Sequence, residues 1–213
     1  MHPERRVYKS KDGPRQHIIE TAERLLAEYG LEGVSLRQIG VTAGKANNSL
    51  IQYHFGDKAG LIREIISRRV ESFEQRRQEL FAAAEAKGQL SDLRTLLEIV
   101  LLPLAEATNA DGRHVYARFL IQFTTHFQHQ DGVQHPGWSR DSAATAAAQL
   151  LAKQLPFLSP NEFRNRINRL GTFFLCALVE RDNALANNRP VQKEKAFFDE
   201  LFAMIVAAIQ VRT

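Results

Sequence analysis

A run of short polar side chains occupies residues 47–52 of the sequence. Asn47, Asn48, Ser49 and Gln52 lie there, within the stretch NNSLIQYHF. Asn and Gln can pair with adenine through two hydrogen bonds in the major groove of double-stranded DNA. When a helix enters this groove with its N-terminus first, the exposed polar residues of its opening turns reach the base edges. We therefore expect these four side chains to contact bases.

Hydrogen-bond donors and positive charge flank this polar run on both sides. Lys58 follows it at the start of a predicted helix, and Ser35 and Arg37 precede it at the start of another. Such groups, together with the free N–H groups of helix N-termini, bind the phosphates of a DNA backbone. Contacts to phosphates position a protein on the duplex without selecting its sequence. We expect Ser35, Arg37 and Lys58 to act in this way.

Three predicted helices hold these residues in place. The first covers residues 14–29 and has an apolar stripe on one face. The second begins after Ser35, which forms a capping box with the glutamine three residues later, and ends at Gly44. The third contains the polar run, with Leu50 and Phe55 as its expected apolar anchors. Three helices of which the last two are joined by a short turn form a helix-turn-helix arrangement.

Residues 18–61 resemble the DNA-binding domain of the TetR family of one-component repressors. The resemblance rests on an Ile/Ala/Leu first helix followed by a set of spaced positions, namely Gly30 to Ser35, Leu36 to Ile39, Ala43-Gly44, Tyr53-His54-Phe55, Lys58 and Leu61. So many spaced positions rarely coincide by chance. From Ala43 through Phe55 this chain has thirteen residues where most relatives have twelve, which predicts one extra residue in the turn.

The resemblance implies further DNA contacts and a mode of regulation. It implies that Tyr53 and His54 touch sugar and phosphate, and that Arg or Lys residues before the first helix reach the minor groove. It also implies a repressor that a small-molecule ligand releases from its operator. The full set of expected DNA-contacting residues is Ser35, Arg37, Lys45, Asn47, Asn48, Ser49, Gln52, Tyr53, His54 and Lys58.

The rest of the chain predicts an all-α fold. Almost every longer segment has apolar positions at helical spacing, and no convincing strand is present. Positive charge is concentrated near the start, since residues 1–70 hold twelve Lys and Arg against eight Asp and Glu. We expect a flexible basic arm at 1–13, the helix-turn-helix domain at 14–57, and a larger helical domain for effector binding and dimerisation at 58–213, which begins with a long connecting helix.

A homodimer is expected, because one such unit contacts only a few base pairs. Two copies would bind the half-sites of a palindromic or near-palindromic operator. Two long, strongly apolar helices close the chain, and the usual four-helix interface of the family agrees with pairing through them. The expected interface residues are Phe173, Phe174, Ala177, Phe198, Leu201, Phe202, Ile205 and Ile209. The alternative is that both helices complete the core of a monomer.

Aromatic residues concentrate in the middle of the chain. In TetR relatives a small molecule binds this region and shifts the spacing of the two reading heads, so the resemblance implies an effector pocket here. The expected lining residues are Tyr116, Phe119, Phe123, His126 and Trp138. The alternative is that these side chains, which recur at helical spacing, belong to an ordinary core.

Composition excludes several classes of protein. With 213 residues, 44% apolar and 24% charged, the chain has the composition of a globular domain. Its one cysteine, Cys176, cannot form an internal disulfide, which favours a reducing cytosol. No apolar run approaches the ~18 residues that a membrane span needs. We expect a cytoplasmic protein with no membrane partner.

No motif predicts an enzyme. The sequence contains no Gly-rich phosphate loop, no HExxH and no GxSxG. His126 and His129 are spaced as metal ligands, but apart from Asp131 no carboxylate or thiol joins them at ligand spacing. We expect no catalytic residue, no cofactor and no metal. The alternatives to a ligand-responsive regulator are a DNA-binding protein without effector and, more distantly, an all-helical enzyme.

Overall fold

The structure is a computed structural model that describes residues 6–7, 13–44, 48–127 and 142–212, of which 6–7, 48–50 and 126–127 are described by their backbone alone. Nine α-helices, one π-helical turn and two short strands lie in these ranges. The predicted all-α fold is confirmed. The effector-binding and dimerisation roles of the larger domain stay a prediction.

The helices form two parts, an N-terminal unit and a larger body. The N-terminal unit, residues 14–55, consists of α1 (Pro14–Tyr29), α2 (Leu36–Thr42) and α3 (Asn48–Phe55), and α4 (Lys58–Ala86) leads out of it. The body, residues 93–209, consists of α5 (Leu93–Glu106), α6 (Val115–Gln122), which the π-helical turn η1 (Phe123–Phe127) continues, α7 (Ala143–Gln154), α8 (Pro160–Ala186) and α9 (Glu194–Ile209).

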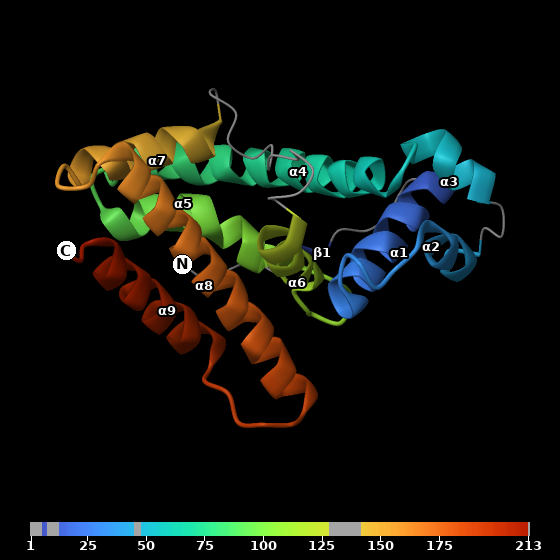
Figure 1. Ribbon diagram of the computed structural model, residues 1–213. Coiled ribbons are helices and arrows are strands. Elements are labelled where there is room, and N and C mark those ends of the chain that lie inside the picture. Colours follow the sequence, from blue (N-terminus) through green and yellow to red (C-terminus); the bar gives the residue numbers. More distant parts are fainter. Residues whose placement is uncertain (1–5, 8–12, 45–47, 128–141, 213) are drawn as a thin grey trace.

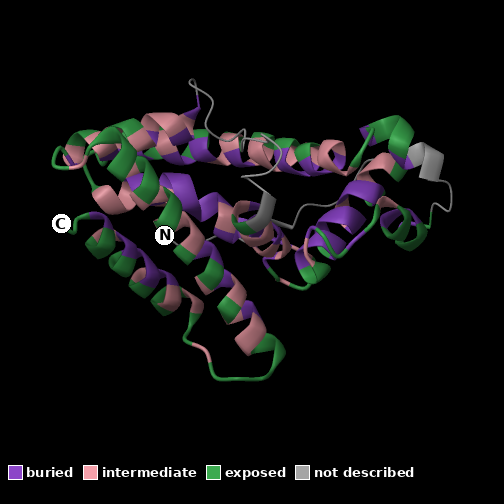
Figure 2. Cartoon of the chain, viewed as in Figure 1, coloured by how far each residue is buried: buried purple, intermediate pink, exposed green. Residues whose placement is uncertain are grey.

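One long helix and one helix pair join the two parts. The connecting helix α4 extends from the N-terminal unit along the body, where it packs on α5 and α7 (Figure 1). Helix α1 lies against α6, so the N-terminal unit rests on the body through this pair. The buried residues of these helices, coloured purple on the ribbon in Figure 2, belong to one hydrophobic core. The position of the N-terminal unit therefore depends on how α1 packs against α4 and α6.

Local sequence signals set most of the helix ends. At the start of α2, the backbone N–H of Gln38 donates to Ser35 Oγ at 3.2 Å and the backbone N–H of Ser35 donates to Gln38 Oε1 at 2.7 Å. This is the predicted capping box. Ser159 and Glu162 form a second one before α8. Asp92 caps the start of α5, where its side chain accepts from the backbone N–H of Thr95 at 2.8 Å.

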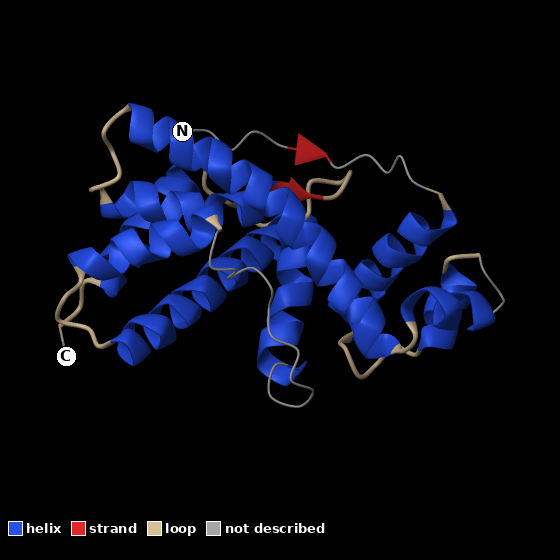
Figure 3. Ribbon diagram, turned by 90° about the horizontal axis from the view of Figure 1, so that it is seen from above, coloured by secondary structure: helices blue, strands red, loops and turns tan. Residues whose placement is uncertain are grey.

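A pair of two-residue strands is an element that the sequence analysis did not expect. Strand β1 (Arg6–Val7) pairs in parallel with β2 (Ala107–Thr108), with Arg6 opposite Ala107 and Val7 opposite Thr108. Figure 3 shows the two arrows side by side. Two residues are too few to display a strand period. The predicted basic arm at 1–13 lies mostly outside the described residues, and the part that is described is held on the body.

The structure corrects the predicted dimer interface. Six of the eight expected residues are buried inside a single chain, because α8 and α9 pack on each other and on α5. For example, the rings of Phe174 and Phe202 lie 5.6 Å apart between α8 and α9. The six are Phe174, Phe198, Leu201, Phe202, Ile205 and Ile209. A partner can reach only the exposed Phe173 and the half-buried Ala177.

The structure also corrects the predicted effector pocket. Phe119 and Phe123 are fully buried and follow Tyr116 in a stack along α6, with centroid distances of 5.8 Å and 6.4 Å between successive rings. These two phenylalanines belong to the core. The side chain of His126 and all of Trp138 lie outside the described residues. Tyr116 borders a cavity, which is treated below.

Two further expectations concern what the described part of the chain contains. None of its helices combines the length and the hydrophobicity needed to cross a bilayer. Within the same ranges, no three His, Cys, Asp or Glu side chains are grouped as ligands for a metal ion.

Candidate nucleic-acid interface

Helix α3 presents three consecutive side chains to solvent. Gln52, Tyr53 and His54 are exposed, Tyr53 to 84%, and the rings of Tyr53 and His54 meet edge to face at a centroid distance of 5.3 Å. On the opposite side Ile51 and Phe55 are buried against the N-terminal unit. The helix therefore offers one polar edge while its apolar side is fixed.

The anchoring residues differ in part from the prediction. Phe55 is buried as expected, whereas the side chain of the other predicted anchor, Leu50, lies outside the described residues. The structure adds Ile51, which is completely buried. The signal for it was available, since Ile51 and Phe55 are four residues apart and so lie on one helix face.

Two of the remaining predicted base-contacting residues lie at the start of α3. Asn48 and Ser49 are in its first turn, where a helix that enters a groove by its N-terminus makes its contacts, but their side chains lie outside the described residues. Lys45 and Asn47, and with them the predicted extra residue of the turn, also lie outside.

The expected phosphate-binding residues lie at two helix N-termini. Ser35 and Arg37 are exposed at the start of α2, and Lys58 is half-buried in the first turn of α4. The unpaired N–H groups of these turns add to the positive potential. Exposed Arg63, which the sequence analysis did not single out, lies in the second turn of α4, 3.9 Å from Asp57 Oδ1.

A tight joint fixes α3 relative to α4. Gly56 has a φ of 72°, a left-handed conformation that favours glycine, and the backbone N–H of Gly60 donates to the capping Asp57 Oδ1 at 2.6 Å. A Cβ at Gly60 would lie 1.9 Å from the carbonyl oxygen of Phe55. The close approach of the two helices therefore depends on a glycine that the sequence analysis did not single out.

Two ion pairs connect α1 to α4 behind the reading edge. Arg15 lies 2.9 Å from Glu64 and stacks over the ring of Phe55 at 5.2 Å, so its charge is used within the protein. Deeper in, the guanidinium of Arg69 donates to both carboxylate oxygens of buried Glu23, at 2.6 Å and 2.9 Å. Bidentate pairs of this kind restrict orientation as well as distance. They tie the N-terminal unit to the connecting helix.

Comparison with known proteins agrees with this geometry. Residues 18–65 match the family model of bacterial regulatory proteins of the tetR family. The HTH-type transcriptional repressor AcnR of Corynebacterium glutamicum is 43% identical over 47 residues, which are 22% of this chain and 24% of AcnR. The HTH-type transcriptional regulator AcrR of Shigella flexneri is 32% identical over 122 residues, 57% of this chain and 53% of AcrR. The chain thus spans about a quarter to about half the length of the curated relatives that it matches.

Two solved structures align with most of the chain at low similarity. A TetR-family transcriptional regulator from Rhodococcus sp. covers 93% of this chain with a TM-score of 0.48 and 13% identity, and a mutant of HlyIIR covers 96% with a TM-score of 0.38 and 14% identity. The family assignment rests on the sequence match and on the helix-turn-helix geometry. Residues 18–65 thus match the N-terminal domain of the tetR family of bacterial regulatory proteins, and the positions of α2 and α3 agree with this match.

Proposed function

We propose that the protein is a transcriptional repressor that binds a palindromic or near-palindromic operator as a homodimer and leaves it when a small molecule binds. The observation that carries the proposal is the polar edge of α3, where Gln52, Tyr53 and His54 are exposed while Ile51 and Phe55 are buried behind them. Among the relatives, AcnR is described as a transcriptional repressor, which supports the same sign of regulation here.

Each polar residue of the interface has a distinct expected role. Asn48, Ser49 and Gln52 read base edges, with Gln52 well placed to pair with adenine. Tyr53 and His54 contact sugar and phosphate. Ser35, Arg37 and Lys58 bind phosphates at the starts of α2 and α4, and the two turn residues Lys45 and Asn47 complete the set.

The outer face of α8 and α9 supports a homodimer. Phe173 is 39% and Met204 50% exposed, and both border a groove of about 370 Å³ between the two helices, together with half-buried Ala177. Glu180 and Arg181 bring charge to the same groove. An apolar centre with charged residues beside it is the usual composition of a subunit interface.

A selection and gel-shift experiment tests DNA recognition. Random-sequence duplexes enriched on the wild-type protein supply the operator, and binding is then measured against a scrambled duplex. Gln52→Ala is expected to weaken operator binding by about 1–3 kcal/mol and to relax preference at one position, whereas Lys58→Ala weakens both duplexes alike. Gln75→Ala, at an exposed position in the middle of α4, is the matched control. Equal losses on operator and scrambled duplex for Gln52→Ala would contradict base reading.

Sedimentation velocity tests the dimer. Phe173→Glu combined with Met204→Glu places like charges on the outer face of α8 and α9, and the protein is expected to sediment as a monomer. Tyr29→Glu, which alters another exposed aromatic residue at the end of α1, is expected to leave the dimer intact. A wild-type protein that is monomeric at micromolar concentration would contradict the proposal.

A further inference from the structure

Three buried polar atoms surround one cavity without a hydrogen-bond partner. Within the described residues, the shielded side-chain atoms that lack one are Gln16 Oε1, Thr108 Oγ1 and the hydroxyl of Tyr116. All three residues line the same cavity, although they come from α1, β2 and α6. Leaving a buried polar group without a hydrogen bond destabilises a folded protein. Their coincidence at one place indicates that something else completes the site.

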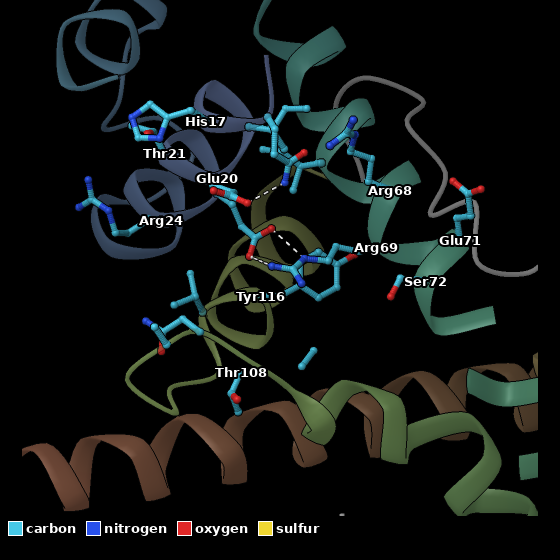
Figure 4. Close-up of a pocket in the computed structure, with 18 of the residues that line it drawn as sticks. His17, Glu20, Thr21, Arg24, Arg68, Arg69, Glu71, Ser72, Thr108 and Tyr116 are labelled. Atoms are coloured by element: carbon cyan, nitrogen blue, oxygen red, sulfur yellow. Dashed lines mark hydrogen bonds and ion pairs between the residues drawn. The ribbon is translucent and has the colours of Figure 1, made fainter. Parts of the chain in front are cut away.

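This junction cavity lies between the N-terminal unit and the body. Its walls are α1 and α4 on one side and β2, the following loop and the start of α6 on the other, and it is partly open to solvent (Figure 4). Its volume is about 880 Å³. Pockets that hold small molecules are commonly of this size.

Tyr116 is the most rigidly held of the three groups. It is 1% exposed, and its ring lies 5.4 Å from that of Phe73 and 5.8 Å from that of Phe119. The guanidinium of Arg69 lies 5.4 Å from the same ring. Burial raises the pKa of Tyr116 well above its ordinary value, so the phenol stays neutral. It is therefore a fixed hydroxyl that can donate and accept.

The other two groups add complementary hydrogen-bonding capacity. Thr108 is 9% exposed and its backbone is held in the pairing with Val7, which leaves its hydroxyl to donate or accept. The side-chain amide of Gln16 donates to Glu20 at 2.7 Å, so its carbonyl oxygen is left as an acceptor. Together the three residues offer two hydroxyls and one carbonyl.

The arginines on the cavity wall are paired within the protein. Arg69 is bound by Glu23 at 2.6 Å, Arg68 lies 3.3 Å from Glu64, and Arg24 lies 3.9 Å from Glu28. Each arginine of the lining thus has a carboxylate nearby. An anionic ligand would gain little here, whereas an uncharged polar molecule would meet unsatisfied hydrogen-bonding groups.

We propose that the junction cavity binds a small uncharged molecule that bears both hydrogen-bond donors and acceptors, such as hydroxyl or amide groups, and that its binding displaces the N-terminal unit from the body. The three unpartnered atoms are shielded from solvent while α1 packs against α6. A ligand reaches them only when this contact opens. The ligand therefore binds the displaced arrangement better, which is the condition for coupling. The inference rests on the proposed function, in which α1 to α3 carry the operator-binding surface.

Ligand-observed NMR tests the site without DNA. The probe is a panel of uncharged fragments that each carry a hydroxyl or a primary amide, screened against the full chain. Tyr116→Phe with Thr108→Val removes both hydroxyls and keeps the side-chain shapes. We expect fragments that bind the wild type to lose about tenfold or more in affinity for this double variant. The matched control, Tyr29→Phe with Thr172→Val, alters hydroxyls outside the cavity and is expected to retain them.

Three outcomes would overturn the site. They are the absence of any binding fragment, equal affinities for wild type and double variant, and a crystal structure in which ordered water alone bridges the three groups and no fragment displaces it. A gel shift with the best fragment then tests the coupling, and unchanged operator affinity overturns that part. Failure of the proposed function is distinguishable, because a protein that binds no DNA can still bind fragments in a Tyr116-dependent way.

Discussion

The body and the junction with the N-terminal unit both bury polar side chains, and they treat them differently. In the body His114 is buried on α6 with partners on both ring nitrogens, Asp182 Oδ1 at 2.9 Å and the carbonyl of Ala105 at 3.1 Å. At the junction Tyr116, two residues along the chain, keeps an unpaired hydroxyl. The contact around Tyr116 can therefore open without the loss of a hydrogen bond from its hydroxyl, whereas the contact around His114 cannot open without breaking those of its ring.

The hydrogen bonds of the body bind three helices into one unit. Both ring nitrogens of His114 are engaged, Nδ1 by Asp182 on α8 and Nε2 by the carbonyl oxygen of Ala105 on α5. Asp182 also accepts the backbone N–H of His114 at 2.6 Å. Nearby, Arg76 donates twice to buried Glu106, at 2.8 Å each. Moving α5, α6 or α8 would break several of these bonds at once.

Fewer hydrogen bonds would break if the junction opened. Its main polar tie is the pair between Glu23 and Arg69, and the unsatisfied atoms around the cavity gain partners when water or a ligand enters. Transitions of this kind use elements whose contacts can be exchanged while the packed units on either side remain rigid. The comparison therefore predicts that substitutions of buried polar residues lower the free energy of unfolding strongly in the body and less at the junction.

The largest expected effect is that of Asp182→Asn in the body. Asp182 accepts the backbone N–H of buried His114 and lies 2.9 Å from its ring Nδ1, and breaking one side of such a buried pair costs about 3–5 kcal/mol. The free energy of unfolding from urea titration measures it. Glu85→Gln, on an exposed part of α4, is the control and is expected to change little. A loss below about 1 kcal/mol would show that the body does not depend on this contact.

Glu23→Gln at the junction is expected to cost less, about 1–3 kcal/mol. Glutamine keeps one acceptor for Arg69, and the arginine is accessible enough to recover water, with 23% of its side chain exposed. The same urea titration, with Glu32→Gln as the exposed control, ranks it against Asp182→Asn. An equal or larger loss than in the body would reverse the comparison.

Local patterns predicted the elements well. The range 14–29 for α1 and the capping box at Ser35 depend on residues within a few positions of one another, and both are found in the structure. On α3 the prediction named Phe55 as a buried anchor but did not name Ile51, which is also buried. Periodicity shows that a helix has an apolar side, and only packing decides which residues fill it.

Features that depend on distant contacts were not predictable from local patterns. Phe202 and Ile205 have the sequence character of interface residues, yet α5 and α8 cover them within one chain. The junction cavity joins Gln16, Thr108 and Tyr116 from separate elements, and no spacing in the sequence relates them. Tyr116 belongs both to the predicted aromatic pocket and to this cavity, whose lining residues are mainly polar.

Tyr116→Phe at the junction is expected to leave the free energy of unfolding nearly unchanged or to raise it, in contrast to the substitutions of paired residues. Removal of an unpaired hydroxyl relieves a desolvation penalty, so the free energy of unfolding is expected to stay constant or rise by up to about 1 kcal/mol. Thermal unfolding measures it beside Tyr29→Phe, whose hydroxyl belongs to an exposed residue. A loss greater than about 1 kcal/mol would mean that the hydroxyl is satisfied in the folded protein.

The smallest effect is expected on the outer side of the body, where Asp199 joins α9 to α5. Hydrogen bonds from Lys195 at 2.5 Å and Arg94 at 2.7 Å lower the pKa of Asp199 from its ordinary value of 3.8 to about 2. Because the folded pKa lies below the unfolded one, the contact stabilises the protein above the unfolded value, and the stabilisation is lost as the pH falls toward the folded value.

Asp199→Asn is therefore expected to lower the melting temperature slightly at neutral pH, and the difference from wild type is expected to shrink as the pH falls from about 4 toward 2. Solvent screens this exposed contact, which keeps the effect below those of the buried pairs. Added salt is expected to reduce it further, whereas it leaves the effect of Asp182→Asn nearly unchanged. If the difference in melting temperature did not change with pH, the contribution of Asp199 would come from packing rather than from its charge. The stability of the body would then depend on its interior contacts.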